Sequence, residues 1–265
     1  MARLWLIGCG NMAGAMLRRW LDAGTVAARD VFVVNRHDRD LPGNLAQARA
    51  FPEGPLPDVV MLGMKPQQLD AVAGDFAGRL AGMPLLVSIL AGVELATLAQ
   101  RFQAQAIVRA MPNLPVAFGK GVVALHGAQG APAQDVATRL MAPLGLVEWI
   151  AEERLFDMVT ALAGSGPGFT FRFIDALAAA GARLGLPADQ AARLALATVE
   201  GSAIMAGASD AAPAVLADRV ASPGGSTREG LNVLDRNGAL EDLLYETLAA
   251  ATRRNAEMAA AARGG

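Results

Sequence analysis

The 265-residue sequence has few of the residues that build disulfides and metal clusters, and it lacks the long uncharged run of a membrane span. Its single cysteine, Cys9, excludes an intrachain disulfide and any multi-cysteine metal site, and it fits a reducing, cytoplasmic setting. No run without Asp, Glu, Lys or Arg exceeds 14 residues, whereas a spanning helix needs about 20. The mean hydropathy of +0.33 therefore indicates apolar cores and interfaces, and we expect no membrane partner.

An excess of charge of either sign is also missing. The net charge is −2 and charged residues make up 18% of the chain, so there is neither a basic surface for nucleic acid nor an acidic tail. Only two histidines are present, and we expect no metal site. The predicted partners are small molecules.

Two halves with different periodicity follow one another. Up to about residue 150, short apolar runs alternate with helical patterns, which is typical of βα units on a parallel sheet. Beyond that point the pattern is helical only, and runs of small residues such as Ala178–Ala182 indicate close helix packing within one subunit or at a subunit interface. We predict an α/β fold, with an N-terminal Rossmann doubly wound parallel sheet over residues 1–151 and an all-α substrate-binding and dimerisation domain over residues 152–265. The expected strands are Leu4–Ile7, Val31–Val34, Val59–Leu62, Leu85–Ser88, Ala106–Arg109, Val122–Leu125 and Leu146–Trp149.

A glycine fingerprint follows the first expected strand. Gly8-Cys9-Gly10-Asn11-Met12-Ala13 places Gly-x-Gly-x-x-Ala between a strand and a helix. The first glycine allows a tight turn, the second lets the backbone approach a pyrophosphate, and the alanine lets helix and strand pack closely. These six residues are predicted to bind a dinucleotide.

The second expected strand ends in Asn35-Arg36 rather than in an acidic residue. A carboxylate there would bind the ribose 2′-hydroxyl of NAD, whereas a guanidinium suits a 2′-phosphate. We predict contacts from Asn35 and Arg36 and a preference for NADP(H), with NAD(H) possible; the alternative is an ordinary surface arginine. His37 is expected to face solvent or to lie near the phosphate.

Two loops are expected at the carboxyl edge of the sheet. Gly63-Met64-Lys65-Pro66 follows the third strand, where doubly wound domains bind ligands, although Pro66 also suits a plain helix start. A second loop is expected over Arg109-Ala-Met-Pro-Asn-Leu-Pro115, and the side-chain amide of its Asn113 can bind a ligand from either end. A proline-stiffened connection is an equally good reading of that second loop.

A Gly-rich turn interrupts the helical half at Ser222-Pro-Gly-Gly-Ser-Thr227. Ser226 and Glu229 have the spacing of a capping box, which predicts a helix start after the turn. A helix N-terminus favours an anion, and the hydroxyls of Ser222, Ser226 and Thr227 can reach a bound molecule. The alternative is an ordinary turn between helices.

Taken in sequence order, these motifs resemble those of the pyrroline-5-carboxylate reductase family over essentially the whole chain. The matching segments are Ile7-Gly-Cys-Gly-Asn-Met12, Lys65-Pro66, Arg109-x-Met-Pro-Asn113, and Gly164-Ser-Gly-Pro167 with Ser222-Pro-Gly-Gly-x-Thr227. The resemblance implies NAD(P)H-dependent reduction of 1-pyrroline-5-carboxylate to L-proline by a homodimer or higher oligomer formed through the helical domain. It also implies that Ser222, Gly224, Gly225, Ser226 and Thr227 hold the substrate, with Thr227 as the catalytic residue that orients the ring nitrogen.

Three departures from the family pattern concern the ring pocket. Gly168-Phe169 replaces the common Ala-Tyr, Leu114 replaces Thr, and Asp235 replaces Glu. A substrate with a six-membered ring, such as piperideine carboxylate, therefore remains an alternative. A β-hydroxyacid dehydrogenase would need a lysine at the position of Thr170. Reduction of a ketone requires a proton donor from the protein, whereas an imine arrives already protonated and does not require one. A non-catalytic nicotinamide-binding protein would have no use for the substrate turn.

Overall fold

The computed structural model describes residues 3–127 and 130–263. The chain divides into two compact units, Met1–Ser165 with Ala251–Gly265, and Gly166–Ala250. A division at residues 151–152 stays a prediction about where the nucleotide-binding part ends.

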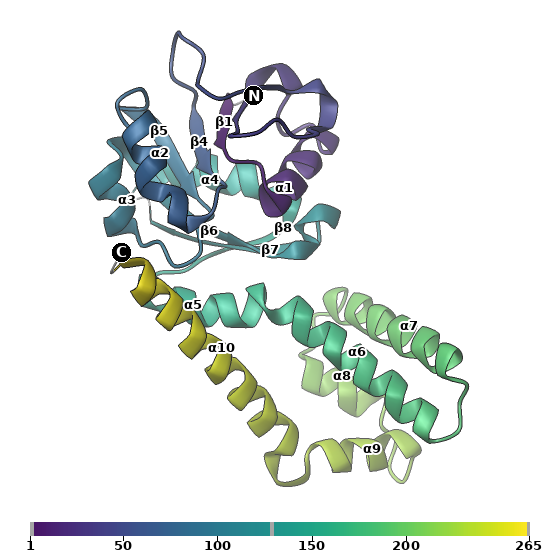
Figure 1. The fold of residues 1–265 in the computed structure, drawn as a ribbon. Coiled ribbons are helices and arrows are strands. Elements are labelled where there is room, and N and C mark those ends of the chain that lie inside the picture. Colours follow the sequence, from purple (N-terminus) through teal and green to yellow (C-terminus); the bar gives the residue numbers. More distant parts are fainter. Residues whose placement is uncertain (1–2, 128–129, 264–265) are drawn as a thin grey trace. The chain divides into compact units, whose positions relative to one another are not determined.

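The first unit is built on an eight-stranded sheet with the order β3-β2-β1-β4-β5-β6-β7-β8 (Figure 1). The sequence order reverses between β1 and β4, which is the point where doubly wound sheets bind their ligands. The strands are β1 (Leu4–Ile7), β2 (Val31–Val34), β3 (Ala46–Ala48), β4 (Val59–Leu62), β5 (Met83–Ser88), β6 (Ala104–Pro112), β7 (Gly121–Gly127) and β8 (Gly145–Trp149).

Alternation along β1 shows why both faces of the sheet are covered. Leu4 and Leu6 join a core with Trp20 on one face, while Trp5 and Ile7 join a second core with Leu98 on the other. The first core takes apolar residues from α1 (Asn11–Asp22) and α4 (Ala131–Met141); the second takes them from α2 (Leu69–Phe76) and α3 (Leu95–Arg101).

Two features of this sheet differ from the sequence expectation. The edge strand β3 was not predicted, because Ala46-Gln47-Ala48 is short and has no apolar periodicity; it pairs in parallel with β2. β6 and β7 are antiparallel, with Ala110 opposite Leu125, because a short connection rather than a crossover helix joins them. The remaining neighbouring strands are parallel.

The second unit is helical. It holds α6 (Gly166–Arg183), α7 (Ala188–Gly207), α8 (Pro213–Arg219), α9 (Ser226–Leu234) and the first half of α10 (Ala239–Arg263). Small residues let α6 and α7 approach closely: a Cβ added to Gly181 would lie 3.5 Å from the Cβ of Ala191. In this unit the buried hydrophobic side chains that the structure describes are all alanines, whereas many large apolar side chains are exposed, among them Phe171, Phe173, Leu194, Ile204 and Tyr245.

Two short helical segments connect the units. Residues Phe156–Val159 form α5, and a π-helical turn over Thr160–Gly164 follows directly. Residues 251–263 of α10 belong to the first unit, where the amide of Asn255 donates a hydrogen bond to the carbonyl oxygen of Asp157 at 3.0 Å. Across the described residues, no helix is both long and apolar enough to cross a membrane.

Candidate functional site

The glycine fingerprint forms a tight crossing of two loops at the switch point. Gly8 has a φ of +82°, and a Cβ there would lie 2.8 Å from the backbone of Met64. A Cβ on Gly63 would lie 2.7 Å from the carbonyl oxygen of Gly8 and 2.9 Å from the Cβ of Ala13. The loops after β1 and β4 can meet because both positions are glycine, and Ala13 is small enough to lie beneath them.

The start of α1 is open to a ligand. Gly10 is its N-cap residue and no side chain caps the helix, so the backbone N–H groups of the first turn are free of side-chain partners. Around Gly10 there is room, because a Cβ there would meet only the oxygen of Gly63 at 4.0 Å. An uncapped helix N-terminus beside an open glycine suits a pyrophosphate.

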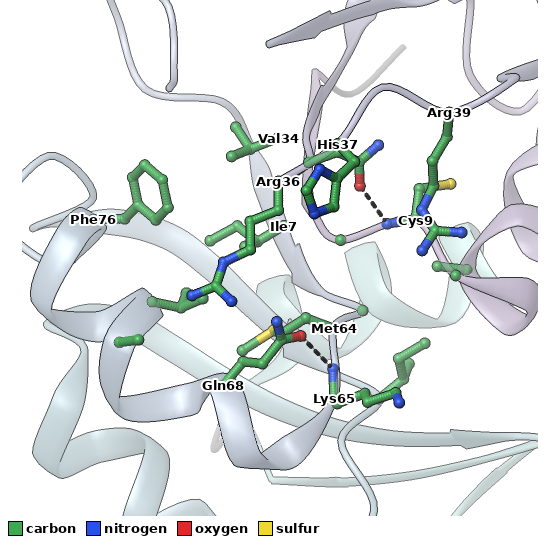
Figure 2. Close-up of a pocket in the computed structure, with 18 of the residues that line it drawn as sticks. Ile7, Cys9, Val34, Arg36, His37, Arg39, Met64, Lys65, Gln68 and Phe76 are labelled. Atoms are coloured by element: carbon green, nitrogen blue, oxygen red, sulfur yellow. Dashed lines mark hydrogen bonds between the residues drawn. The ribbon is translucent and has the colours of Figure 1, made fainter. Parts of the chain in front are cut away.

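A pocket of about 750 Å³ lies over this crossing (Figure 2). It brings together most of the predicted cofactor residues: Gly8, Cys9, Gly10, Asn11, Met12, Ala13, Asn35, Arg36, Gly63, Met64 and Lys65. Pro66 and Asn113 do not line it. The pocket is also lined by residues that were not predicted as cofactor contacts, namely Ile7, Val34, Arg39, Arg49, Gln68, Ala71, Val72, Asp75, Phe76 and Ile89.

Asn35 forms a hydrogen bond with the backbone of the glycine loop. It is only 6% exposed, and its Oδ1 accepts a hydrogen bond from the Cys9 N–H at 3.0 Å (Figure 2). An acidic side chain would satisfy the same donor but would bring a negative charge to the pocket. The amide therefore fixes the loop without adding a negative charge at position 35.

Basic side chains gather on the loop after β2. Arg36, His37 and Arg39 line the pocket, and Arg49 joins them from the residue after β3. Figure 2 shows Arg36 reaching toward the side where Gln68 and Phe76 lie, while Arg39 lies beside Cys9. Arg39 was not predicted as a cofactor contact. Its position three residues after Arg36 on the same loop could have indicated it. Such a cluster suits a phosphate group.

Cys9 lies between the pocket and α1. Burial raises the pKa of its thiol, and the positive charges of Arg18 and Arg39 partly oppose that rise. The side chain is therefore a neutral thiol at neutral pH, and it acts as a small apolar residue under the loop.

The loop after β4 is braced by a residue that was not predicted. The side chain of Gln68 accepts a hydrogen bond from the Lys65 N–H at 3.2 Å, and Pro66 starts the short helix Pro66–Gln68. Lys65 is exposed and lines the pocket. Pro66 thus shapes the loop, and Lys65 supplies its positive charge.

Asn113 holds the backbone on both sides. Its Oδ1 accepts a hydrogen bond from the Val122 N–H at 2.8 Å, and its Nδ2 donates one to the carbonyl oxygen of Ala163 at 3.0 Å. The side chain joins the loop after β6 to the π-helical turn. A cofactor contact by Asn113 stays a prediction.

A second, largely apolar pocket of about 240 Å³ adjoins the first, since Met12 and Ile89 line both. Arg109 borders it and is only 6% exposed; its Nη1 lies 2.7 Å from Oε1 of Glu153, and its guanidinium lies 4.6 Å from the ring centre of Phe156. The remaining lining residues are Leu90, Ala91, Gly92, Ala110, Met111, Pro112, Asp157, Thr160, Asn255 and Met258. The last two belong to α10, and no local motif in the sequence places them here.

The predicted substrate turn lies in the second unit. Gly225 N–H donates to the carbonyl oxygen of Ser222 at 2.9 Å, and Gly224 has a φ of +71°. Proline followed by a glycine of positive φ is the pattern of a type II turn. The Ser222 hydroxyl lies over Gly225, where a Cβ would come within 2.6 Å of it.

The helix after this turn starts differently from the prediction. Gly225 is the N-cap of α9 and Ser226 is its first residue, so the capping box of Ser226 with Glu229 is wrong. Because glycine has no side chain to cap the helix, the first-turn N–H groups stay open. In the described part of the chain, the hydroxyls of Ser222, Ser226 and Thr227 have no hydrogen-bond partner. These groups can bind a carboxylate and donate to or accept from a ring nitrogen.

Comparisons with known proteins cover the whole chain. A family model described as pyrroline-5-carboxylate reductase dimerisation matches residues 153–258, and one described as NADP oxidoreductase coenzyme F420-dependent matches residues 3–92. The pyrroline-5-carboxylate reductase of Synechocystis sp. is 38% identical over 97% of this chain and 98% of the relative. That of Pseudomonas aeruginosa is 37% identical over 97% of both chains.

A solved structure agrees with these relatives. The pyrroline-5-carboxylate reductase from Coxiella burnetii has a TM-score of 0.88 at 30% identity, over 97% of this chain and 98% of that one. The glycine crossing, the open start of α1 and the Ser222–Thr227 turn thus occur in a chain that is similar to these reductases from end to end. The chain belongs to the pyrroline-5-carboxylate reductase family.

Proposed function

We propose that the protein catalyses the NAD(P)H-dependent reduction of 1-pyrroline-5-carboxylate to L-proline. The observation that carries this proposal is the pocket over the glycine crossing at the switch point, in a chain that aligns over 97% of its length with a reductase of that name. A reduced nicotinamide, when bound, supplies a hydride to the carbon of the substrate C=N bond.

The residues present fit a dinucleotide. The first-turn N–H groups of α1 and the open space at Gly10 would hold the pyrophosphate, and the cradle is one that a Cβ at Gly8 or Gly63 would fill. Lys65 would lie near the negative charges of the pyrophosphate. The adjoining apolar pocket beside Met12 and Ile89 has the size for the nicotinamide ring.

NADP(H) is the preferred cofactor in this proposal. Arg36, His37 and Arg39 line the adenosine end of the pocket, and buried Asn35 stands where NAD-dependent proteins have a carboxylate. A 2′-phosphate there would gain charge-assisted hydrogen bonds and meet no negative charge from position 35.

The substrate carboxylate is assigned to the turn before α9. The backbone N–H group of Ser226 and the hydroxyls of Ser222 and Ser226 would hold it, and Thr227 would orient the ring nitrogen. Gly224 and Gly225 make the turn possible, and the Gly225 N–H is used within it. An imine with its nitrogen protonated needs no strong acid from the protein, so hydroxyls and amides suffice. The six-membered piperideine carboxylate is the alternative substrate.

A ketone reductase is a poorer fit. The position where β-hydroxyacid dehydrogenases have lysine holds Thr170, and its Oγ1 donates back to the carbonyl oxygen of Gly166 at 3.0 Å. That hydroxyl is already bonded within α6, and it cannot replace the ammonium group of a lysine as a proton donor.

We assign the exposed apolar side chains of the helical unit to an interface with a second copy. Phe171, Phe173, Ile204 and Tyr245 are each more than half exposed in the single chain, and the dimerisation family model covers this region. A homodimer through residues 152–265 would bury them. The single cysteine supports a reducing, cytoplasmic location.

The test follows NADPH absorbance at 340 nm with three substrates at equal concentration. We expect turnover of 1-pyrroline-5-carboxylate, weaker turnover of piperideine carboxylate, and none of a β-keto acid. Turnover of the keto acid alone would overturn the imine assignment, and a preference for the six-membered ring would shift it to the alternative.

A further inference from the structure

We propose that Gln47 is a positioning residue that sets cofactor choice by fixing the loop that faces the 2′-phosphate. This inference rests on the proposed preference for NADP(H). Gln47 lies in the middle of β3, the edge strand beside β2, and its side chain reaches back over the loop that leaves β2.

One side-chain amide fastens both ends of a five-residue segment. Oε1 of Gln47 accepts a hydrogen bond from the Arg39 N–H at 3.1 Å and one from Nδ2 of Asn35 at 3.3 Å. Nε2 of Gln47 donates to the carbonyl oxygen of Arg39 at 2.7 Å. Asn35 is in turn tied to the Cys9 N–H of the glycine loop at 3.0 Å. The amide of Gln47 therefore couples the loop after β2 to the pyrophosphate cradle.

The segment between these ends carries charges of both signs. Its sequence is Asn35-Arg36-His37-Asp38-Arg39, and Asp40 follows. In the conformation that Gln47 holds, Arg36, His37 and Arg39 line the pocket. Asp38 does not line it, and Asp40 lines a smaller adjoining pocket instead. A loop free to turn would bring those carboxylates to the same place and repel a phosphate. Fixing the backbone thus keeps the basic side chains of this loop toward the pocket, whose acidic lining residue, Asp75, comes from α2.

The hydrogen bonds from Gln47 matter because the loop that they hold is exposed to solvent. Residues 36 to 40 are all exposed, and a solvated loop loses binding free energy when a ligand must order it. A backbone that is already fixed through Arg39 avoids that loss. The effect is expected at the 2′-phosphate, because the segment that Gln47 fixes carries Arg36, His37 and Arg39.

The experiment measures dissociation constants by isothermal titration calorimetry for 2′,5′-ADP and for 5′-AMP, which differ in the 2′-phosphate. The full-length variants are Gln47→Ala and Gln47→Leu, the second keeping the side-chain bulk. The matched control is Gln105→Ala, which removes a side-chain amide bonded to the carbonyl oxygen of Gly82, away from both pockets. Thermal unfolding is recorded for each protein.

We expect wild type and Gln105→Ala to bind 2′,5′-ADP more tightly than 5′-AMP by a factor of about 10 or more. Both Gln47 variants should lose about tenfold in affinity for 2′,5′-ADP and less than twofold for 5′-AMP. The Michaelis constant for NADPH should rise accordingly while kcat and the constant for NADH change little.

The possible failures are distinguishable. If wild type does not prefer 2′,5′-ADP, the proposed preference for NADP(H) falls and this inference falls with it. If wild type has the preference and both Gln47 variants keep it, the positioning role alone is overturned. Equal losses for both ligands would mean that Gln47 merely supports the fold.

Discussion

Asn113 and Ala163, 50 residues apart in sequence, are joined by a 3.0 Å hydrogen bond from the side-chain amide to the backbone carbonyl. Ala163 lies inside the π-helical turn Thr160–Gly164. A π-turn disturbs the regular backbone bonding of a helix, and Asn113 supplies a donor where the chain leaves the sheet unit. The side chain is 7% exposed, so water cannot readily replace it.

Replacing Asn113 by alanine should destabilise the first unit. The change leaves the carbonyl of Ala163 and the N–H of Val122 without their partner, which costs about 3 kcal/mol in the free energy of unfolding. Urea denaturation measures the loss, and Gln103→Ala, at an exposed amide, should change it by less than about 0.5 kcal/mol. A shift as small as that of the control would show that water satisfies both groups.

Gly63→Ala should harm cofactor binding and stability together. The new Cβ would lie 2.7 Å from the carbonyl oxygen of Gly8, so the two loops must separate at a cost of about 1–3 kcal/mol. Gly74→Ala in α2 is the matched control, because nothing lies within 4 Å of its Cβ position and alanine favours a helix by about 0.5–1 kcal/mol. Thermal unfolding should show opposite signs for the two variants, and calorimetry should show weaker NADPH binding for Gly63→Ala only. Unchanged NADPH affinity in Gly63→Ala would argue against a cradle at this crossing.

Arg36→Ala should discriminate between the two nicotinamide cofactors. Loss of a charge-assisted contact to the 2′-phosphate should raise the Michaelis constant for NADPH about tenfold or more, while the constant for NADH stays nearly unchanged. Steady-state kinetics with saturating imine substrate gives both values. Equal changes for the two cofactors would contradict a phosphate contact by Arg36.

Thr227→Ala should lower turnover more than it weakens NADPH binding. A hydroxyl that orients the ring nitrogen contributes mainly during hydride transfer, so kcat should fall about tenfold or more. Thr227→Ser, which keeps the hydroxyl, should recover most of the activity. Thr247→Ala removes a hydroxyl bonded to its own helix at Leu243 and should leave kcat unchanged. If Thr227→Ala behaved like Thr247→Ala, the role of Thr227 would be structural.

The buried parallel strands could be predicted well from the sequence. Leu4–Ile7, Val31–Val34 and Val59–Leu62 are short apolar runs bounded by turn residues, and the structure places strands at these same bounds. β3 escaped prediction because its side chains are largely exposed and its pairing with β2 depends on the sheet rather than on its own residues.

The residues of the candidate site also differ in how well the sequence predicts them. The glycine fingerprint is local, and its backbone geometry follows from residue type. Gln47 and Asn255 contribute through contacts with segments that other elements position, and an isolated amide in a sequence has no periodicity or spacing to reveal it. Gln68 is different, because it bonds the Lys65 N–H only three residues away. The start of α9 was misplaced by one residue because Gly225 can serve as an N-cap as well as Ser226.

The most direct test of the proposed reaction uses NADPH deuterated at the transferable C4 position. After incubation with 1-pyrroline-5-carboxylate, mass spectrometry of the product should show L-proline that carries one deuterium at Cδ, the former C=N carbon. Proline without deuterium, or no proline while NADPH is consumed with another substrate, would contradict hydride transfer to the imine.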